Sequence, residues 1–400
     1  MEVVILGAGY AGLRALKALQ KADDLHITLI DKNDYHYEAT DLHEVAAGTQ
    51  TKESISYLIE DVVESHKTTF IKGEVTKIDA EKQTVLLADG KEINYNYLIV
   101  ALGFESESFG IAGVEEFALP MVNVETAAAV HQHILAMMQK YQETKDENYL
   151  KIVVCGAGFT GIELLGALVE GRKEYAQIAG VKPEDIQIYC VEAVDHLLPM
   201  FSEKLAAYGI DHLKSWGVQL LTGKPIKEIK ADTVVYQDDA ETKALKELTA
   251  KTIIWTTGVS GSHVIGASGF EQRRGRVTVT DHLTAPDHEN IYVIGDVSAV
   301  MDATSKRPYP TTAQISLKMG HYAAKHLLAT LKGQTIAPFT FKSLGSVASI
   351  GNSHAFGVVG AAEVKGYPAS FIKKAILDRS LLETGGIKEM LAKGRFDLYH

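Results

Sequence analysis

The chain has 400 residues, of which 46% are apolar and 23% charged, and its net charge is −11. This length allows two or three domains with cores of their own, and the composition is that of an ordinary globular protein. The acidic balance argues against a nucleic-acid-binding protein, and no apolar run approaches the roughly 20 residues that a membrane span needs. The chain enters a strand pattern by residue 3, so we expect no signal peptide.

The first predicted element is a strand at residues 3–6, which leads into a glycine fingerprint. The fingerprint has the order G-x-G-x-x-G, and its glycines are Gly7, Gly9 and Gly12. A strand, a tight turn and a helix start at this spacing direct backbone N–H groups and the positive end of a helix at a pyrophosphate. The next strand, at residues 26–30, ends at Asp31, whose carboxylate would accept hydrogen bonds from the ribose of the same nucleotide.

The same pattern recurs in the second half of the chain. A strand at residues 152–155 leads into a second fingerprint, with glycines Gly156, Gly158 and Gly161. The strand that follows, at residues 186–191, ends at Glu192, and each half has a later strand that ends in glycine (Gly103 and Gly258). We interpret this duplication as two dinucleotide-binding domains of α/β class, and two adjacent dinucleotides usually exchange electrons.

Two acidic residues of the second half suggest which coenzyme binds there and how it is oriented. A carboxylate at Glu192 would repel the 2′-phosphate of NADPH, and no arginine follows it closely, so we expect NADH. Glu163 lies two residues after the last glycine, in the first helical turn. It is either an acid that suits a helix N-terminus or a group that orients a nicotinamide and passes a proton.

A third strand, at residues 290–295, ends at Asp296. This carboxylate would bond a ribityl hydroxyl of a flavin, or else cap the following helix. A helix-like stretch after Pro310 would direct its positive N-terminus toward the flavin ring. We therefore predict that the second nucleotide domain is inserted into the first. The predicted FAD domain comprises residues 1–112 and 281–345, and the predicted NADH domain comprises residues 113–280.

The last segment, residues 346–400, differs from both halves. Short glycine-rich strands precede Pro368, which is a favourable first residue for a helix, and Gly385-Gly386 would end that helix. Four apolar residues share one stripe of it: Phe371, Ile372, Ala375 and Ile376. Residues 368–400 carry six basic and four acidic residues, a local reversal of the chain's charge. We expect an amphipathic segment that lies on a membrane surface or forms a dimer, and core packing is the alternative.

The cysteines and histidines exclude two kinds of site. Cys155 and Cys190 both lie in apolar strand patterns, so we interpret them as small buried hydrophobes without a disulfide framework, as in a reducing cytosol. The two cysteines lack the spacing of a redox-active dithiol, and the histidines are scattered, so we expect no metal. His36 and His43 fit loop-shaping hydrogen bonders better than ligands.

Together these motifs resemble those of type II NADH dehydrogenases, the single-subunit NADH:quinone oxidoreductases of bacterial respiratory chains. The resemblance covers essentially the whole chain and rests on both fingerprints and on residues 32–37, 42–48, 101–103, 191–192, 255–258, 294–296 and 311–314. It implies a two-dinucleotide flavoprotein fold of two Rossmann-like domains with a C-terminal membrane-anchoring segment. It also implies that hydride passes from NADH to FAD, and two electrons then pass to a quinone, without proton pumping.

The resemblance also assigns site residues. Those implied to bind FAD are Gly7, Ala8, Gly9, Tyr10, Ala11, Gly12, Asp31, Lys32, Val75, Gly103, Asp296, Ala313, Gln314 and Lys373. Those implied to bind NADH are Gly156, Gly158, Gly161, Glu192 and Gly258, and Glu163 matches the family's catalytic carboxylate. The quinone would approach Gln314 and Lys318. The family usually has a second glutamine at the latter position, and the lysine would add positive charge there and alter quinone preference and pH dependence.

The implied partners are a menaquinone-type quinone, a second copy of the chain in a homodimer, and the cytoplasmic side of the cell membrane. Residues 368–400 would make the membrane contact as a peripheral attachment, and no nucleic acid is expected. One alternative is a soluble NADH-dependent flavoprotein reductase, or an NADH-sensing flavoprotein, with a protein acceptor. A sulfide:quinone or disulfide reductase is disfavoured because the chain lacks a cysteine pair of suitable spacing.

Overall fold

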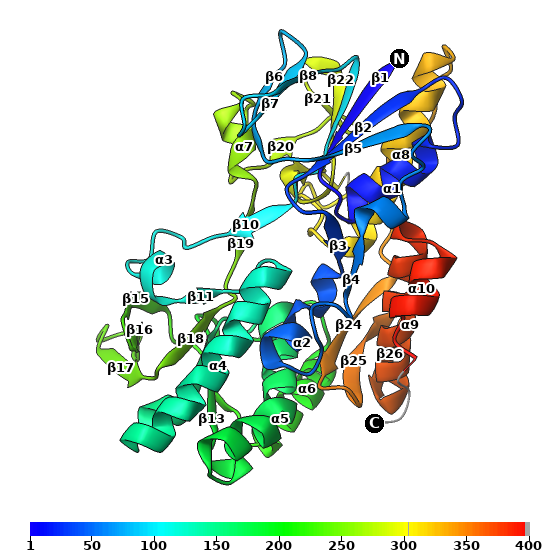
Figure 1. The fold of residues 1–400 in the computed structure, drawn as a ribbon. Helices are drawn as coiled ribbons and strands as arrows, with labels where there is room; N and C mark the ends of the chain where they lie inside the picture. The colour runs from blue at the N-terminus through cyan, green and yellow to red at the C-terminus, as the bar shows by residue number, and fades with distance from the viewer. Residues whose placement is uncertain (303, 397–400) are drawn as a thin grey trace.

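The computed structural model describes residues 1–302 and 304–396. It contains two sheets of mainly parallel strands, each covered by helices, and a C-terminal segment that lies against both units (Figure 1). In the described residues no helix combines the length and the apolar character needed to cross a membrane. The fold is thus the mixed α/β architecture with two Rossmann-like units that the alternating sequence patterns predict.

The first sheet has six strands in the order β21-β22-β9-β1-β2-β5. Their bounds are Thr284–Ala285, His288–Val293, Tyr97–Val100, Glu2–Leu6, His26–Asp31 and Thr68–Lys72. The central strand β1 is buried on both sides, which explains its continuous apolar run. On one face lie α1 (Tyr10–Leu19) and α8 (Ala313–Leu331), and on the other lies the antiparallel sheet of β6 (Val75–Asp79), β7 (Thr84–Leu87) and β8 (Glu92–Asn94).

The second sheet repeats this plan with five strands in the order β11-β18-β12-β13-β14. Their bounds are Leu119–Pro120, Thr252–Trp255, Lys151–Cys155, Gln187–Val191 and Gln219–Leu221. The helices of one face are α4 (Val124–Thr144), α5 (Phe159–Ala179) and α6 (Glu203–Ser215). The opposite face carries β15 (Ile226–Lys230), β16 (Thr233–Gln237) and β17 (Leu245–Thr249). The repeat of sheet, helices and antiparallel cover explains why both halves of the sequence show one pattern.

The remaining elements are connections and short pieces. The strands and α-helices among them are β3 (Tyr35–Tyr37), β4 (Ser56–Leu58), α2 (Leu42–Ala47), α3 (Val114–Phe117), β20 (Val277–Thr278) and β23 (Ser298–Ala299). The 3-10 turns are η1 (Ala39–Asp41), η2 (Ile59–Asp61), η3 (Glu147–Leu150), η4 (Pro183–Asp185) and η5 (Gly295–Val297).

The two units are joined by an antiparallel pair, β10 (Phe104–Ser106) and β19 (Val259–Gly261). The first sheet takes its strands from residues 2–100 and 284–293, and the second takes them from residues 119–255 between these two stretches, which supports our proposal of an inserted domain. The helix after β19 is α7 (His263–Ala267). Its Val264 and Ile265 lie in the core of the first unit, and so does Val277 further along the chain. We therefore place the return to the first domain at β19, earlier in the chain than the residue 281 suggested by the turn-rich sequence there.

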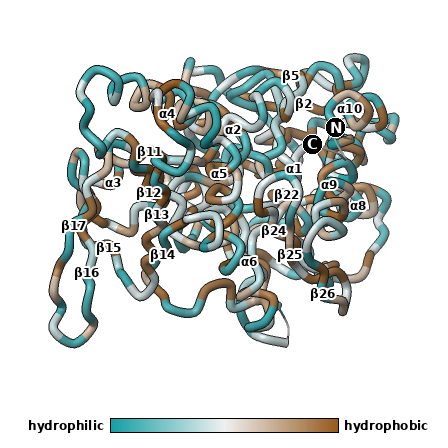
Figure 2. The backbone as a smooth tube through the Cα atoms, turned by 90° about the horizontal axis from the view of Figure 1, so that it is seen from below, coloured by the Kyte–Doolittle hydropathy of each residue, from teal (hydrophilic) through white to brown (hydrophobic). Residues whose placement is uncertain are grey.

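The C-terminal segment begins with an antiparallel sheet of β24 (Gly345–Ile350), β25 (His354–Val359) and β26 (Ala362–Gly366). Two helices follow, α9 (Tyr367–Thr384) and α10 (Ile387–Lys393), with the break at Gly385-Gly386 that the sequence predicts. Ile350 and Phe356 pack in the core of the second unit, whereas Leu381 of α9 packs in the core of the first. The segment therefore holds the two units together, and its helices lie at one edge of the molecule beside α8 (Figure 2).

The predicted apolar stripe of α9 divides between two environments. Ile372 packs against a small buried cluster, whereas Phe371 and Ile376 are 53% and 47% exposed. The buried residues of this helix include several polar ones: Ser370, Lys374, Ser380 and Thr384. The buried side of the helix therefore mixes these polar groups with Leu377 and Leu381, while Phe371 and Ile376 stay exposed, so the helix is not divided into an apolar inner face and a polar outer face as an ordinary surface helix is.

Candidate functional site

The outer glycines of each fingerprint are required by the fold itself. Gly7 and Gly156 have φ angles of +97° and +105°, in the left-handed region that favours glycine. A Cβ at Gly12 would collide with the carbonyl of Gly7, and one at Gly161 would collide with the carbonyl of Gly156. These four glycines let each strand turn sharply into its helix and let the helix approach the turn.

The middle glycines have a different role, because nothing in the protein requires them. A Cβ at Gly9 or at Gly158 would meet no atom within 4 Å. Both residues are the N-caps of their helices, α1 and α5, and neither cap is filled by a side chain. The absent side chains therefore leave space beside free helix N-termini, which is the arrangement that lets a pyrophosphate approach the backbone. Both sites fit a dinucleotide.

The two acids at the strand ends make matching contacts. Asp31 accepts hydrogen bonds from the backbone N–H of Ala8 at 2.6 Å and of Asn33 at 2.8 Å. Glu192 accepts them from the backbone of Ala157 at 2.7 Å and of Val194 at 3.0 Å. Each carboxylate therefore lies at the mouth of its own glycine loop, in the position where we predicted a ribose-binding acid.

The other residues expected to bind FAD lie around the first fingerprint in varied surroundings. Tyr10 begins α1 and donates its hydroxyl proton to Glu38 at 3.0 Å. Asp296 lies in η5 next to Gly295, where a Cβ would come within 3.3 Å of Ala11. Burial raises the pKa of the Asp296 carboxyl, and the nearby guanidinium of Arg276 opposes that shift. The connection from β22 to η5 thus brings Asp296 close to α1, the helix of the first fingerprint.

Three further predicted positions are on exposed or edge segments. Lys32 is exposed, and Val75 begins β6, where its register partner is Leu87. Gly103 has a φ of +74° and open space where a Cβ would be. Gly258, expected to bind NADH, is covered by the ring of Phe109, because a Cβ there would lie 2.5 Å from that ring. Phe109 thus lies against the side of Gly258 on which a side chain would stand.

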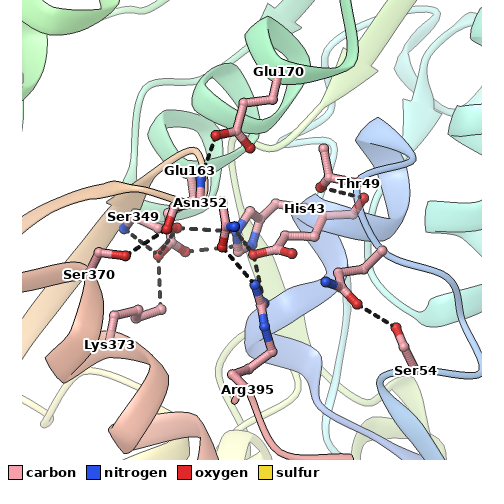
Figure 3. Close-up of polar contacts among 12 residues, drawn as sticks. His43, Thr49, Ser54, Glu163, Glu170, Ser349, Asn352, Ser370, Lys373 and Arg395 are labelled. Carbon is pink, nitrogen blue, oxygen red and sulfur yellow. Dashed lines mark hydrogen bonds and ion pairs between the residues drawn. The ribbon is translucent and has the colours of Figure 1, made fainter. Parts of the chain in front are cut away.

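Glu163 is the fifth residue of α5, just beyond the first turn in which we expected it, and is the centre of a buried polar cluster (Figure 3). Its Oε1 accepts hydrogen bonds from Ser349, at 3.0 Å from the backbone and 3.2 Å from the hydroxyl. The same oxygen is 2.9 Å from the Nζ of Lys373, and Oε2 is 3.9 Å from the Nδ1 of His43. Four elements thus meet here, since the cluster draws on α2, α5, β24 and α9.

The charges of this cluster set the protonation of Glu163. Burial by itself raises the pKa of the Glu163 carboxyl, but Lys373 and His43 outweigh it, and the net shift is downward. Burial likewise opposes the charge of Lys373, but Glu163 and Asp41 raise its pKa above the ordinary value. The pair is therefore a carboxylate and an ammonium at neutral pH, which favours a positioning role for Glu163 over proton donation.

Sequence reasoning missed several members of this cluster. The hydroxyl of Ser349 is 3.2 Å from the Nε2 of His43, and Arg395 donates to Glu44 at 2.9 Å and to Asn352 at 3.1 Å. No local pattern in the sequence marks these residues as partners. The available signal was the pair Lys373 and Lys374 between the apolar stripe residues of α9, because the structure directs a lysine of this pair at the buried Glu163.

The two residues expected to meet the quinone lie one turn apart on α8. Gln314 accepts a hydrogen bond from the backbone of Leu344 at 2.8 Å, so its amide helps to hold the loop that leads into β24. Ala313 is the first residue of α8, after the N-cap Thr312. Lys318 is exposed and lines a cavity of about 440 Å³. The structure thus places Gln314 in a loop contact and Lys318 at an open surface.

Both cysteines are free and buried, as predicted. Burial raises the pKa of both thiols, so neither is a reactive thiolate. In the described part of the chain no group of three or more acidic, histidine or cysteine side chains has the arrangement of a metal site. His36 bonds the carbonyl of Ala8 at 2.8 Å, which is the loop-shaping role expected for it.

Comparisons with known proteins agree with this geometry. The profile of the pyridine nucleotide-disulphide oxidoreductase family matches residues 1–320. The chain is 41% identical over 401 residues to a type II NADH:quinone oxidoreductase of Staphylococcus saprophyticus, covering 99% of this chain and 98% of that one. A protein of the same name from Staphylococcus haemolyticus is 42% identical with the same coverage.

Solved structures share the fold at lower identity. NDH2 from Plasmodium falciparum, in complex with NADH, aligns with a TM-score of 0.87 at 18% identity, over 98% of this chain and 97% of that chain. The sulfide:quinone oxidoreductase of Aquifex aeolicus aligns with a TM-score of 0.78 at 21% identity, over 100% and 96%. The likeness to these two structures concerns the fold.

Proposed function

The chain belongs to the type II NADH:quinone oxidoreductases of the pyridine nucleotide-disulphide oxidoreductase family, and on this premise we propose how its own residues serve the reaction. FAD, when bound, accepts hydride from NADH and passes two electrons to a quinone, without proton pumping. The observation that carries the assignment to this chain is the pair of open glycine positions, Gly9 and Gly158, each at a free helix N-terminus. One site serves FAD and the other serves NADH.

The first fingerprint holds the pyrophosphate of FAD through the backbone of residues 7–12, and Asp31 holds that loop and reaches the ribose. The backbone of Val75 and the side chain of Lys32 serve the adenosine end. The residues that we assign to the ribityl and ring end are Gly103, Asp296, Ala313, Gln314 and Lys373. The placement of Asp296 beside the helix of the fingerprint supports this division.

The second fingerprint holds NADH, with Gly156, Gly158 and Gly161 at the pyrophosphate, Glu192 at the ribose, and Gly258 near the nicotinamide. Glu163 orients the nicotinamide as a fixed carboxylate. Its lowered pKa and its pairing with Lys373 support this role, because a carboxylate that stays ionised accepts hydrogen bonds but carries no proton to donate. Lys373 is the proton-bearing member of the pair.

The quinone approaches Gln314 and Lys318, and a menaquinone-type ring fits the proposal. The ammonium of Lys318 donates to a quinone carbonyl oxygen, as an amide at this position would, but it also carries a charge. Positive charge beside a carbonyl stabilises negative charge that develops on its oxygen. Lys318→Gln is therefore expected to change the rate and the pH dependence of the quinone step while leaving the NADH step unaffected.

The C-terminal helices supply the membrane contact. Large apolar side chains on their outer surface are exposed, and we call the following five residues the tail face: Phe371, Ile376, Leu382, Ile387 and Leu391. Each of these five is at least 39% exposed. An apolar face of this kind favours burial in a membrane surface, here on the cytoplasmic side, or in a homodimer that leaves part of it to lipid.

Stepwise mixing tests the proposed function. FAD-loaded protein is mixed anaerobically with NADH, and a short-chain quinone is then added while the flavin absorbance is followed. We expect NADH to bleach the flavin quickly, NADPH to do so slowly, and the quinone to restore the colour. Bleaching without recovery would contradict the quinone assignment and would support the alternative of a protein acceptor.

A further inference from the structure

A cavity of about 440 Å³ lies where α1, α8, residues 336–340 and α9 meet. The whole chain has a net charge of −11, yet the charged side chains that line this cavity are mainly cationic. The fixed cations are Arg14, Lys318, Lys325 and Arg379, and Glu383 is the only carboxylate that the described residues contribute to the lining. The cavity is therefore a local site of positive charge on an acidic protein.

The helices hold these cations toward one space. Lys318, His321 and Lys325 follow one another at spacings of three and four residues, so they share one face of α8. From the opposite side, Glu383 accepts from the Nε of Arg379 at 2.8 Å and lies 3.5 Å from the Nε of Arg14. One carboxylate thus serves two guanidinium groups, and the buried Nε of Arg14 has no hydrogen-bond acceptor.

The electrostatic environment of His321 reflects this excess. Burial lowers the pKa of His321, and the charges of Arg14, Lys325 and Lys21 lower it further, whereas Glu383 raises it. The imidazole is thus neutral at neutral pH and leaves the fixed cations to set the charge of the cavity. A cavity of this size with an excess of positive charge is within the range of small-ligand sites.

We propose that this cavity binds the phosphate of an anionic membrane phospholipid headgroup. Guanidinium groups such as those of Arg14 and Arg379 bind phosphate oxygens through paired hydrogen bonds, and Lys325 adds charge without a fixed geometry, whereas Lys318 stays assigned to the quinone. The proposal rests on the membrane contact of the tail face, because α9 contributes to both. On α9 the cavity residue Arg379 lies three residues after Ile376 and three before Leu382, two exposed members of the tail face.

This continuity favours a lipid over a free phosphate ion. A lipid held by its phosphate in the cavity would lay its acyl chains along Ile376 and Leu382, which a soluble anion would leave in contact with water. Basic pockets beside an apolar membrane-facing surface bind the headgroups of anionic lipids in this manner. The cavity would then fix where on the membrane, and in which orientation, the protein docks.

Vesicle binding tests the proposal with full-length, FAD-loaded protein. Co-sedimentation is measured with vesicles of phosphatidylcholine alone and of phosphatidylcholine mixed with phosphatidylglycerol. We expect the wild type to prefer the mixed vesicles, and Lys325→Gln or Arg379→Gln each to lose about fivefold of that preference. Binding to phosphatidylcholine alone should stay unchanged, because the tail face is intact. The matched control is Lys342→Gln, which removes the same charge from an exposed lysine outside the cavity lining.

Soluble probes separate the possible ligands. Glycerol 1-phosphate should raise the Tm of the wild type but not of Lys325→Gln, and it should compete with the mixed vesicles. Equal losses in Lys342→Gln and in the cavity variants would show diffuse attraction and overturn the proposal. Saturation by inorganic phosphate that leaves the vesicle preference intact would overturn the lipid assignment. A wild type that binds no vesicles at all would instead overturn the membrane role of the tail face.

Discussion

Asp31 and Glu192 stand at matching positions in the two halves and make the same backbone contacts. Each accepts hydrogen bonds from the alanine inside its glycine loop and from the residue two positions further along the chain. The two carboxylates thus stiffen the two loops in one manner. Under the proposed function their chemical tasks differ, because the second site would have to distinguish NADH from the close analogue NADPH.

Glu192→Gln is expected to weaken that distinction. Removal of the carboxylate removes its repulsion of the 2′-phosphate, and a loss of about 1.4 kcal/mol corresponds to a tenfold lower ratio of kcat/KM for NADH over NADPH. Steady-state kinetics with both coenzymes measure the ratio. Asp31→Asn is the matched control, which should lower the FAD content of the purified protein and leave the coenzyme ratio unchanged. An unchanged ratio in Glu192→Gln would reject the assigned role.

Asp41 is a buried acid that opposes folding at neutral pH. Burial and the nearby Glu44 raise the pKa of its carboxyl from 3.8 to about 8, and its Oδ1 lacks a hydrogen-bond partner. A raised pKa means that the folded state binds the proton more tightly than the unfolded state does. The cost to stability is therefore absent below pH 3.8, grows as the pH rises, and is complete above about pH 8.

Asp41→Asn should remove this cost. We expect the variant to gain about 1–3 kcal/mol of unfolding free energy over the wild type at alkaline pH, and to show little difference at acid pH. Denaturant unfolding across the pH range measures the change. Asp34→Asn serves as the control, because Asp34 is exposed and its hydrogen bond with Lys72 lowers its pKa instead. A gain that is independent of pH would contradict the argument.

At the scale of elements, each strand–turn–helix unit separates glycines that the fold needs from glycines that a ligand needs. The chain itself comes close to Gly7 and Gly12, whereas it leaves the position beside Gly9 open. The same division recurs at Gly156, Gly158 and Gly161 in the second unit. In each motif the outer two glycines are required by close contacts within the chain, and the middle glycine leaves space for a ligand.

The two kinds of glycine should respond oppositely to alanine. Gly12→Ala should destabilise the protein by about 1–3 kcal/mol or more, because its Cβ would collide with the carbonyl of Gly7. Gly9→Ala should leave the stability of the FAD-free protein within about 0.5 kcal/mol of the wild type and reduce FAD binding. Thermal unfolding and FAD titration measure the two effects. Equal loss of stability in both variants would contradict the division.

At the scale of the whole molecule, the C-terminal segment completes the candidate site. Lys373 of α9 pairs with Glu163 of α5, and Arg395 pairs with Glu44 of α2. The Lys373 contact explains why α9 places a charged side chain against the body of the protein while Phe371 and Ile376 stay exposed. The packed C-terminal segment therefore supplies positive charges to Glu163 and Glu44, and the same packing leaves the tail face exposed.

A double-mutant cycle measures this coupling. Lys373→Met should destabilise the protein by about 3–5 kcal/mol, because it leaves the Glu163 carboxylate buried without its partner. Adding Glu163→Gln should recover part of that loss. The pKa of Glu163 is lowered from 4.5, so the coupling is present above that pH and is lost as the pH falls through the lower folded value. Lys388→Met, which removes an exposed ion pair with Asp61, should change stability little and is the control.

The sequence by itself determined the repeating units of this protein. Apolar runs, glycines at fixed spacing and an acid at the next strand end are local signals, because the residues that form a strand, its turn and its helix are neighbours in the chain. These signals were sufficient for the strands β1, β2, β12 and β13, for the fingerprints and for the break at Gly385-Gly386. They also marked Glu163 as a candidate.

Only the tertiary structure decided what surrounds Glu163 and which way the tail faces. Ser349 and Lys373 are far from Glu163 in the chain and reach it because the C-terminal segment packs against both units. The cationic cavity likewise combines α1, α8 and α9. A pattern of apolar residues predicts that a helix has a face to bury, but long-range packing decides what covers that face. In α9 the buried side includes Leu377 and Leu381, and Lys373 pairs with the buried Glu163.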